Sequence, residues 1–159
     1  MGFLTWLEGT GFADWVRMSA AGYPMMITLH AIGMGIMVGL AVLLDMRLLG
    51  WFPGISFSSL HRFLGVAWVG FGINFLSGCG LFASQATMYA TDLVFLTKIG
   101  FVFLGAITAA LLQSAVGRDS ANWGDRVPSG VRTIAIASIA CWAIAITAGR
   151  LTAYIMYTI

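Results

Sequence analysis

Four apolar stretches, each long enough to cross a lipid bilayer, are the feature that most constrains how this chain can fold. A spanning helix needs about 20 consecutive, mostly apolar residues. The stretches cover residues 24–49, 60–83, 93–116 and 131–157. Backbone polar groups find no water inside a bilayer, so each stretch must pair them internally, as a helix does. The sequence predicts an all-α membrane protein: one membrane domain, residues 1–159, built as a four-transmembrane-helix bundle.

The composition indicates that lipid hydrocarbon, rather than water, surrounds most of this chain. Hydrophobic residues make up 60% of the chain and charged residues only 9%, whereas soluble domains carry about 25% charged residues. Most of the surface must therefore face lipid, and the bilayer is the first expected partner. The formal net charge of +2 gives no indication of nucleic-acid binding.

Residues 3–18 differ from the rest, because they mix aromatic and aliphatic side chains with acids and an arginine. The segment is too short and too polar to span, and Gly9 and Gly11 weaken its helical pattern. We expect an N-terminal interfacial amphipathic helix, or a hook, that lies on the membrane surface.

Basic residues predict the orientation of the chain. One side of the predicted membrane carries five arginines: Arg47, Arg62, Arg118, Arg126 and Arg132. The other side carries only Arg17 and Lys98, together with acids. Cytoplasmic loops are enriched in arginine and lysine, so we expect the five arginines in the cytoplasm and both termini in the periplasm.

Three basic residues fall inside the predicted spans at a similar depth. His30, Lys98 and Arg150 each lie about five to seven residues from the outer end of a span, or roughly 8–10 Å at a helical rise of about 1.5 Å per residue. Gly78 lies in the same layer. Each residue alone has an ordinary explanation, since the cations can reach the headgroups and the histidine can bond a neighbouring helix. Together, with no acid at that depth, they predict a pocket for a negatively charged or hydrogen-bonding guest.

Haem b is one candidate guest. His30 can be an axial ligand, Lys98 and Arg150 can hold the propionates, and Gly78 can let the ring approach the backbone. The second histidine, His61, is predicted near the cytoplasmic end, roughly 20–25 Å away in depth. It cannot serve the same haem, so a second ligand is missing.

Two other guests stay open. A quinone headgroup can hydrogen-bond to the same histidine and cations. Cu(I) suits imidazole, thioether and thiolate ligands, which predicts His30, Met26, Met34 and Cys79 as a metal site. Methionines at helical spacing are also ordinary apolar packing.

Other polar and small residues predict how the helices pack. Asp45 is expected to pair with a nearby arginine, either Arg47, Arg62 or Arg132, as an anchor at the cytoplasmic boundary. Gly35 and Gly39 form a GxxxG motif that permits close helix contact. Asn74 is expected to find an interhelical partner, because an unpaired amide in lipid is costly.

Several motifs occur in an order that extends over nearly the whole chain. They are Tyr23-Pro24 ahead of His30, residues 45–50, residues 68–71, Ser77-Gly78, Leu81-Phe82, Phe95 with Lys98, and Gly149-Arg150 followed by Ala153-Tyr154. This order resembles a family of small bacterial membrane proteins with four spanning helices and no assigned activity. More distantly, the helices look like CopD-type copper-resistance proteins and small b-type cytochromes. The resemblance implies the bacterial inner (cytoplasmic) membrane and a redox or copper setting. It also adds Tyr154 to the cofactor-binding candidates.

The function that these features predict is a small integral membrane subunit of a redox complex, which binds haem b or a quinone near the periplasmic side for electron transfer. The alternatives are a structural, anchoring subunit without a cofactor, and a Cu(I)-binding or transport protein. We find no nucleophile–base pair, phosphate loop or carboxylate pair, so independent catalytic activity is not expected. Expected partners are other membrane or periplasmic redox subunits, or further copies of the chain. The sequence does not choose between a cofactor and a lipid at the basic layer.

Overall fold

The computed structural model describes residues 2–123 and 126–155, and every regular element in these ranges is a helix. Four of the helices are long: α3 (Gly22–Leu48), α4 (Phe57–Ser84), α6 (Leu93–Asp119) and α7 (Ser129–Ile155). Their ends agree with the predicted spans to within three residues, although the predicted end of the last span, at Tyr157, lies outside the described residues. The predicted all-α bundle is confirmed.

The four long helices have the length and the surface of membrane-spanning segments. Each contains 27 or 28 residues, or about 40 Å at 1.5 Å per residue, which exceeds a hydrocarbon core of about 30 Å. Large apolar side chains cover the outside of the bundle, for example Leu76 (72% exposed), Val69 (63%) and Ile136 (58%). A surface of this kind is stable in lipid rather than in water. The chain is therefore a multi-pass membrane protein.

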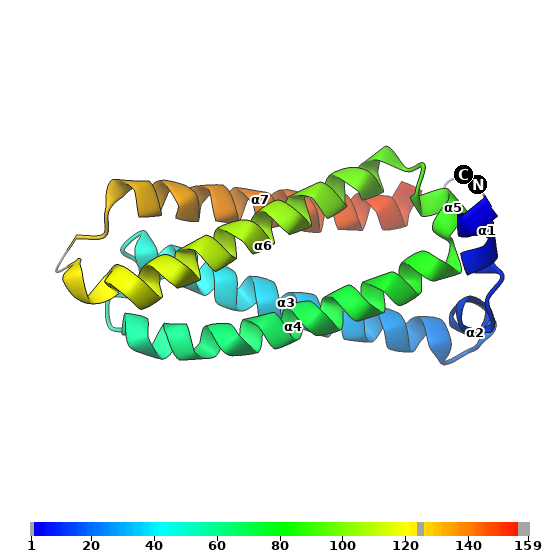
Figure 1. The fold of residues 1–159 in the computed structure, drawn as a ribbon, viewed down its shortest axis with the longest axis horizontal. Helices are drawn as coiled ribbons and strands as arrows, with labels where there is room; N and C mark the ends of the chain where they lie inside the picture. The colour runs from blue at the N-terminus through cyan, green and yellow to red at the C-terminus, as the bar shows by residue number, and fades with distance from the viewer. Residues whose placement is uncertain (1, 124–125, 156–159) are drawn as a thin grey trace.

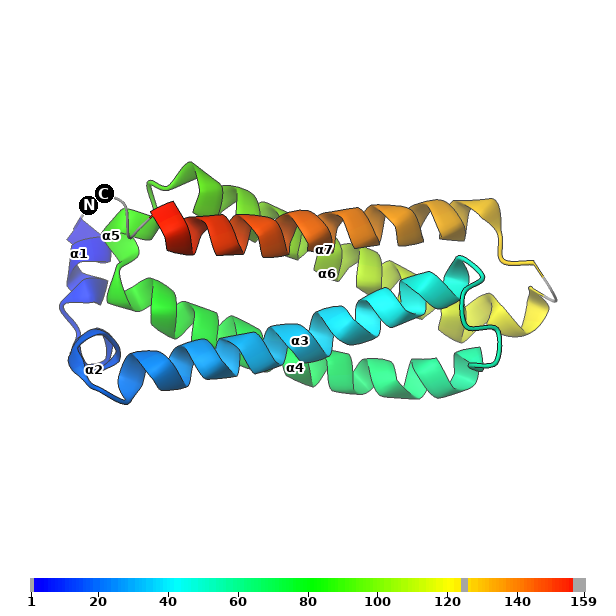
Figure 2. The ribbon, with the colours of Figure 1, turned by 180° about the vertical axis from the view of Figure 1, so that it is seen from behind.

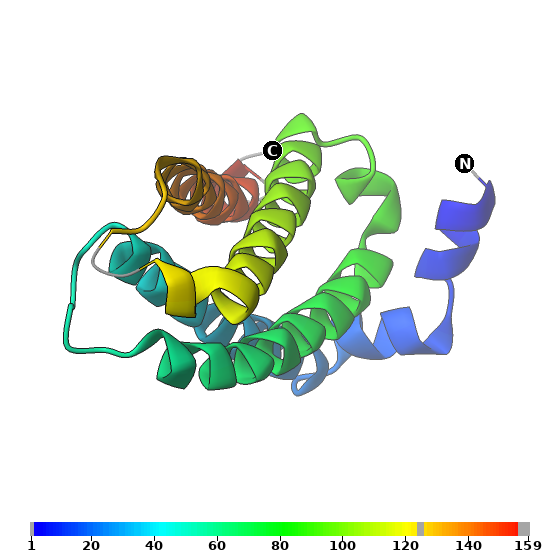
Figure 3. The same ribbon diagram turned by 60° about the vertical axis from the view of Figure 1, so that its left-hand side comes forward.

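The long helices form two antiparallel hairpins. Helix α3 packs along α4, and α6 packs along α7 (Figures 1 and 2). The hairpins meet mainly through α3 and α7, whereas α4 and α6 touch each other much less. Figure 3 looks more nearly along the helices and shows them around a common interior. We call the end that carries the start of α1 and the end of α7 the cap end, and the opposite end, with the α3–α4 and α6–α7 connections, the loop end.

Glycine allows the closest approach between α3 and α4, but not at the predicted motif. A Cβ added to Gly33 would lie 2.5 Å from the backbone nitrogen of Asn74 and 2.6 Å from the carbonyl oxygen of Gly70. Around Gly35 and Gly39, by contrast, no atom of the described chain lies within 4 Å of such a Cβ. The predicted GxxxG contact is wrong within this chain, because these two glycines face outward while Gly33 faces α4.

The main cluster of buried apolar side chains lies in the loop-end half of the bundle. Its buried residues include Met37, Leu44, Leu64, Leu112 and Trp142, which come from all four long helices. This core fixes α3 against α7, and so it determines which side chains of these two helices meet near the bundle axis.

The N-terminal segment forms two short helices rather than the single predicted one. Helix α1 covers Gly2–Glu8 and α2 covers Gly11–Met18. The break lies at Gly9 and Thr10, where the Thr10 side chain accepts a hydrogen bond from Ala13 N at 3.3 Å and so caps α2. The two helices cover the cap end next to the short helix α5 (Ala86–Tyr89).

Polar contacts attach this N-terminal segment to the cap end. Glu8 Oε1 accepts hydrogen bonds from the backbone nitrogen and from Oγ1 of Thr87, both at 2.8 Å. Arg17 donates to the carbonyl oxygen of Ser84 at 3.1 Å and pairs with Asp14. The backbone and hydroxyl bonds from Thr87, and to a smaller extent the charge of Arg17, hold the pKa of Glu8 below its usual value.

Candidate functional site

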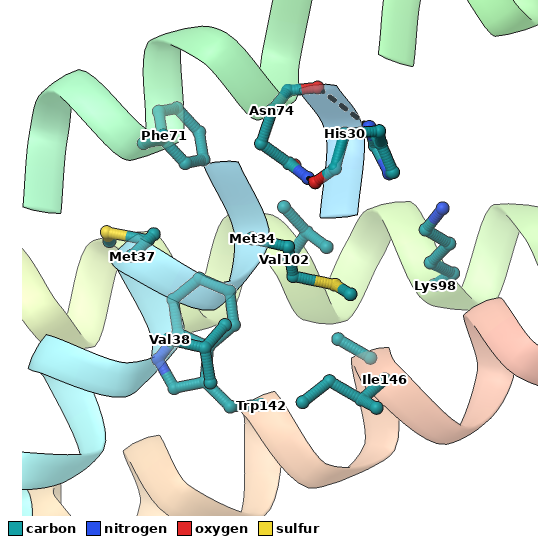
Figure 4. Close-up of a pocket in the computed structure, with 11 residues that line it drawn as sticks. His30, Met34, Met37, Val38, Phe71, Asn74, Lys98, Val102, Trp142 and Ile146 are labelled. Carbon is teal, nitrogen blue, oxygen red and sulfur yellow. Dashed lines mark hydrogen bonds between the residues drawn. The ribbon is translucent and has the colours of Figure 1, made fainter. Parts of the chain in front are cut away.

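A small cavity lies between α3, α4, α6 and α7, in the half of the bundle nearer the cap end. Its polar lining comes from His30, Asn74 and Lys98, and the rest of its wall is apolar (Figure 4). The cavity volume is about 20 Å³, and one water molecule needs roughly 10–15 Å³ on the same measure. As packed, the space has room for one water molecule and for no larger group.

His30 is held in a defined orientation by α4. Its Nδ1 lies 2.9 Å from the backbone carbonyl oxygen of Asn74, and the Asn74 side-chain nitrogen donates to the carbonyl oxygen of His30 at 2.8 Å. The expected interhelical partner of Asn74 is thus confirmed. A carbonyl oxygen only accepts, so Nδ1 carries the proton and the neutral ring keeps its lone pair on Nε2. Histidines that bind metals or substrates are commonly oriented by such a bond.

Gly78 makes room for the imidazole. A Cβ at this position would lie 3.1 Å from Cε1 and 3.3 Å from Nδ1 of His30. The prediction placed Gly78 in the layer of His30, and the two residues are in contact. The space that Gly78 leaves is filled by the ring of His30 itself, rather than kept open for a macrocycle.

Lys98 reaches the same cavity from α6. Its stem packs on Gly149 of α7, where an added Cβ would lie 3.3 Å from Cε. Its amine lies 5.9 Å from the centre of the Phe95 ring, and close enough to His30 for its positive charge to disfavour a second one on the imidazole. Among the described residues the Lys98 amine has no acidic partner. The ion pair found in these residues joins Arg17 to Asp14. Figure 4 shows the imidazole and the amine on the same side of the cavity.

Arg150 and Tyr154 lie outside this arrangement. Arg150 follows Gly149 on α7, so it belongs to the same layer, but its side chain is exposed and does not line the cavity. Tyr154 is 66% exposed. The structure therefore brings together His30, Gly78 and Lys98, and leaves the other two candidates on the surface of α7.

The candidate copper ligands are divided between different surroundings. Met34 lines the cavity beside His30. Met26 packs on α4, with its sulfur 3.1 Å from a Cβ added at Gly80, and Cys79 is exposed on the outside of α4. The described residues contain no group of three or more His, Cys, Asp or Glu side chains placed to hold a metal ion.

His61 lies in a separate depression at the loop end, between α4 and α6. This depression is wide and shallow, with a volume of about 500 Å³, and it is also lined by Gln113, Ser114 and Arg118. The sequence correctly kept His61 apart from His30. Sequence reasoning missed Gln113, whose side chain accepts a hydrogen bond from the Trp68 indole at 2.6 Å and links the two helices.

The predicted pairing of Asp45 is wrong. Asp45 is 1% exposed, and within the described residues neither of its carboxyl oxygens has a hydrogen-bond or ion-pair partner. Arg47 turns away from it, since its Nε donates to the carbonyl oxygen of Ile55 at 2.7 Å and its guanidinium lies over the Phe57 ring. Arg62 and Arg132 are exposed.

No family model, curated protein or solved structure matches this chain. The resemblance to four-helix bacterial membrane proteins and to CopD-type proteins therefore stays a prediction.

Proposed function

We propose that the protein is a small membrane subunit of a redox complex, and that it binds a quinone headgroup at His30 and Lys98. The observation that carries the proposal is the fixed imidazole of His30, whose Nε2 keeps a lone pair on the same side of the cavity as the Lys98 amine. The amine can donate to a quinone carbonyl, and Nε2 can accept from the hydroxyl of the reduced quinol. The headgroup lies at the mouth of the cavity, because the interior holds only a water molecule.

Haem b has less support at this place. A single neutral imidazole suits its iron, but the cavity of about 20 Å³ is far smaller than the 300–1,000 Å³ of ordinary cofactor sites. The ring of His30 also fills the space beside Gly78 that a macrocycle needs. A haem requires α4 and α6 to move apart, whereas a quinone headgroup at the mouth does not.

Copper has less support for a different reason. Met34 is beside His30, but Cys79 is exposed and does not line the cavity. A Cu(I) site here would have imidazole and thioether ligands alone.

The orientation belongs to the same proposal. The loop end carries Arg47, Arg62, Arg118, Arg126 and Arg132, which favours the cytoplasm for this end and the periplasm for the cap end. In a bacterial inner membrane, His30 and Lys98 then lie in the periplasmic half. Helices α1 and α2 expose Phe3, Trp6, Phe12 and Met18, which suits a position in the headgroup region. Short connections leave little of the chain outside lipid, so electrons must pass to a partner subunit.

The test is a binding measurement on the purified protein in detergent. Short-chain benzoquinone and naphthoquinone are titrated separately while tryptophan fluorescence is recorded, because Trp142 lines the cavity and is close enough for quenching. We expect saturable quenching. Lys98→Met should weaken binding of the oxidised quinone by roughly tenfold, and His30→Ala should weaken binding of the same compound after reduction to the quinol by a similar factor, each the equivalent of one lost hydrogen bond of about 1.4 kcal/mol. The matched control is His61→Ala, the other histidine, which should leave binding unchanged.

Other outcomes overturn the quinone site. A Soret band in the purified protein that disappears in His30→Ala replaces the quinone with haem. Bound copper that is lost when Met26 and Met34 are changed favours a metal site. A colourless, metal-free protein whose quenching is unsaturable, or equal in all variants, leaves the anchoring subunit without cofactor.

A further inference from the structure

Asp45 is a carboxyl group in the interior of a membrane protein, and it lacks the partners that such a group requires. It is 1% exposed, and neither carboxyl oxygen has a hydrogen-bond partner in the described part of the chain. An ionised carboxylate without a partner is among the most costly groups to bury, and an ionisable residue within a spanning helix indicates a functional site.

The facing helix α7 supplies two further unpaired polar groups. Ser138 is fully buried and lies opposite the Asp45 carboxyl, close enough to interact with it, although neither group meets the geometry of a hydrogen bond. One helical turn along α7, the indole nitrogen of Trp142 is also buried and unpaired. In Figure 4 this nitrogen lies on the side of the indole ring away from His30 and Lys98. All of the buried side-chain polar atoms found without a partner in the described residues belong to these three residues.

No described cation balances a charge on Asp45. On its own helix, Arg47 is engaged by the Ile55 carbonyl and the Phe57 ring. On α4, His61 is exposed and its ring lies against Gly117 of α6, and Arg62 is exposed. On α6, Arg118 is exposed, as is Arg132 on α7. Lys98 lines the separate cavity nearer the cap end.

The chemistry of the three groups fits both forms of a carboxyl group. A protonated carboxyl donates one hydrogen bond, which the Ser138 hydroxyl can accept. An ionised carboxylate only accepts, and the Ser138 hydroxyl can then donate to it, while the Trp142 N–H is a second unpaired donor one helical turn further along α7. A metal cation fits less well, because an indole N–H offers no lone pair to a metal.

We propose that Asp45 is a proton-binding site inside the loop-end half of the bundle, with Ser138 as its hydrogen-bond partner and the Trp142 N–H as a further unpaired donor one helical turn away. In the loaded state Asp45 is a neutral carboxylic acid. On release, its O–H bond breaks, the proton passes to a water molecule that enters from the loop end, and the carboxylate accepts from Ser138. This inference does not rest on the quinone site: His30 lies about 20 Å from Asp45 along α3 at 1.5 Å per residue, although Trp142 also lines the cavity of that site.

Infrared spectroscopy of the full chain in lipid vesicles tests the proposal. At neutral pH we expect the carbonyl-stretching band of a protonated carboxylic acid, which shifts in D₂O and is absent from Asp45→Asn. Of the other acids, those that the structure describes, Glu8, Asp14, Asp92 and Asp119, are not buried. The matched control is therefore Asp92→Asn, in which asparagine can still cap α6 and the band should stay.

A second variant keeps the test decisive if Asp45→Asn does not fold. Ser138→Ala removes the acceptor for the acid proton, so the band should move to higher frequency, and alkaline titration should remove the band at a different pH from that of the parent chain. Absence of the band at neutral pH, or its persistence in a folded Asp45→Asn protein, overturns the proposal. Sodium-dependent stabilisation of an ionised Asp45 would overturn it in favour of a cation site.

Discussion

The two halves of the bundle treat buried polar groups in opposite ways. Near the cap end, His30 and Asn74 exchange two hydrogen bonds between α3 and α4, and the Ser77 hydroxyl bonds the carbonyl oxygen of Ile73. In the loop-end half, Asp45, Ser138 and Trp142 are more deeply buried, yet their side-chain polar atoms are unpaired.

The difference separates two uses of polar residues in lipid. The paired set fixes the position of the helices and the orientation of the imidazole, and it borders a cavity that is large enough for a water molecule. The unpaired set lies in or beside the main cluster of buried apolar side chains, where lost hydrogen bonds are most costly. The hydrogen bonds of the paired set account for its burial, whereas the unpaired set needs a hydrogen-bond partner that the described chain does not supply. The following predictions test that contrast.

The largest expected effect comes from Gly33→Ala, which separates the helices that carry the paired set. The new Cβ would lie 2.5 Å from the backbone nitrogen of Asn74, and backbone atoms cannot move aside as a flexible side chain can. We expect the free energy of unfolding in mixed micelles to fall by about 1–3 kcal/mol.

The matched control for this prediction is Gly35→Ala on the same helix. Around Gly35 the described chain leaves a new Cβ free of contacts within 4 Å, so the change should be neutral or, through better helix propensity, stabilising by up to about 1 kcal/mol. Equal losses in the two variants would show that α3 and α4 are not packed as described.

A pair of polar substitutions compares the two sets directly. Asn74→Leu should destabilise the protein by about 1–2 kcal/mol, because the His30 carbonyl oxygen loses the 2.8 Å bond from the amide, whereas the bond between the imidazole and the backbone carbonyl of residue 74 is kept. Ser138→Ala removes only the hydrogen bond that we propose between its hydroxyl and the acid of Asp45, so the free energy of unfolding should fall by less than in Asn74→Leu, by about 0.5–1 kcal/mol. Thermal unfolding in one detergent measures both, and a larger loss for Ser138→Ala would contradict the contrast.

The long-range arrangement was largely predictable from the sequence, because it depends on hydrophobicity summed over many residues. The four spans, and the common layer of His30, Gly78 and Lys98, follow from run lengths and the helical rise. What could not be predicted depends on helix rotation. The choice of Gly33 over Gly35, and the isolation of Asp45 from Arg47, are set by which face of α3 points inward. A span that is apolar on all sides contains no signal for that rotation.

The direction in which individual side chains point, and the exact start of a short helix, were equally hard to predict from the sequence. The outward position of Cys79 and of Arg150 is decided by less than one helical turn relative to Gly78 and Gly149, their inward-facing neighbours. The split of residues 3–18 depends on Thr10, whose side chain caps α2. Gly9 and Gly11 predicted that the helix is weak here, but they did not predict which residue begins the second helix.

The smallest expected effect concerns a third polar contact, the one between Glu8 and Thr87 outside the spans. Hydrogen bonds from Thr87 lower the pKa of Glu8 from its ordinary value near 4.5 in the folded state. A lowered pKa means that the contact stabilises the fold fully at pH values above the unfolded-state pKa, and that this stabilisation is lost as the pH falls through the lower, folded-state pKa.

Proteolysis within residues 2–18, followed as the pH is reduced, should therefore accelerate in acid for the parent chain. In Glu8→Gln, cleavage should be faster at neutral pH and should depend less on acid, while Asp14→Asn should leave the Glu8 contact in place and keep the acid-dependent rise. If Glu8→Gln and the parent chain showed the same dependence of cleavage rate on pH, the contact between Glu8 and Thr87 would not hold residues 2–18 in place. Apolar contacts alone would then attach this segment to the cap end.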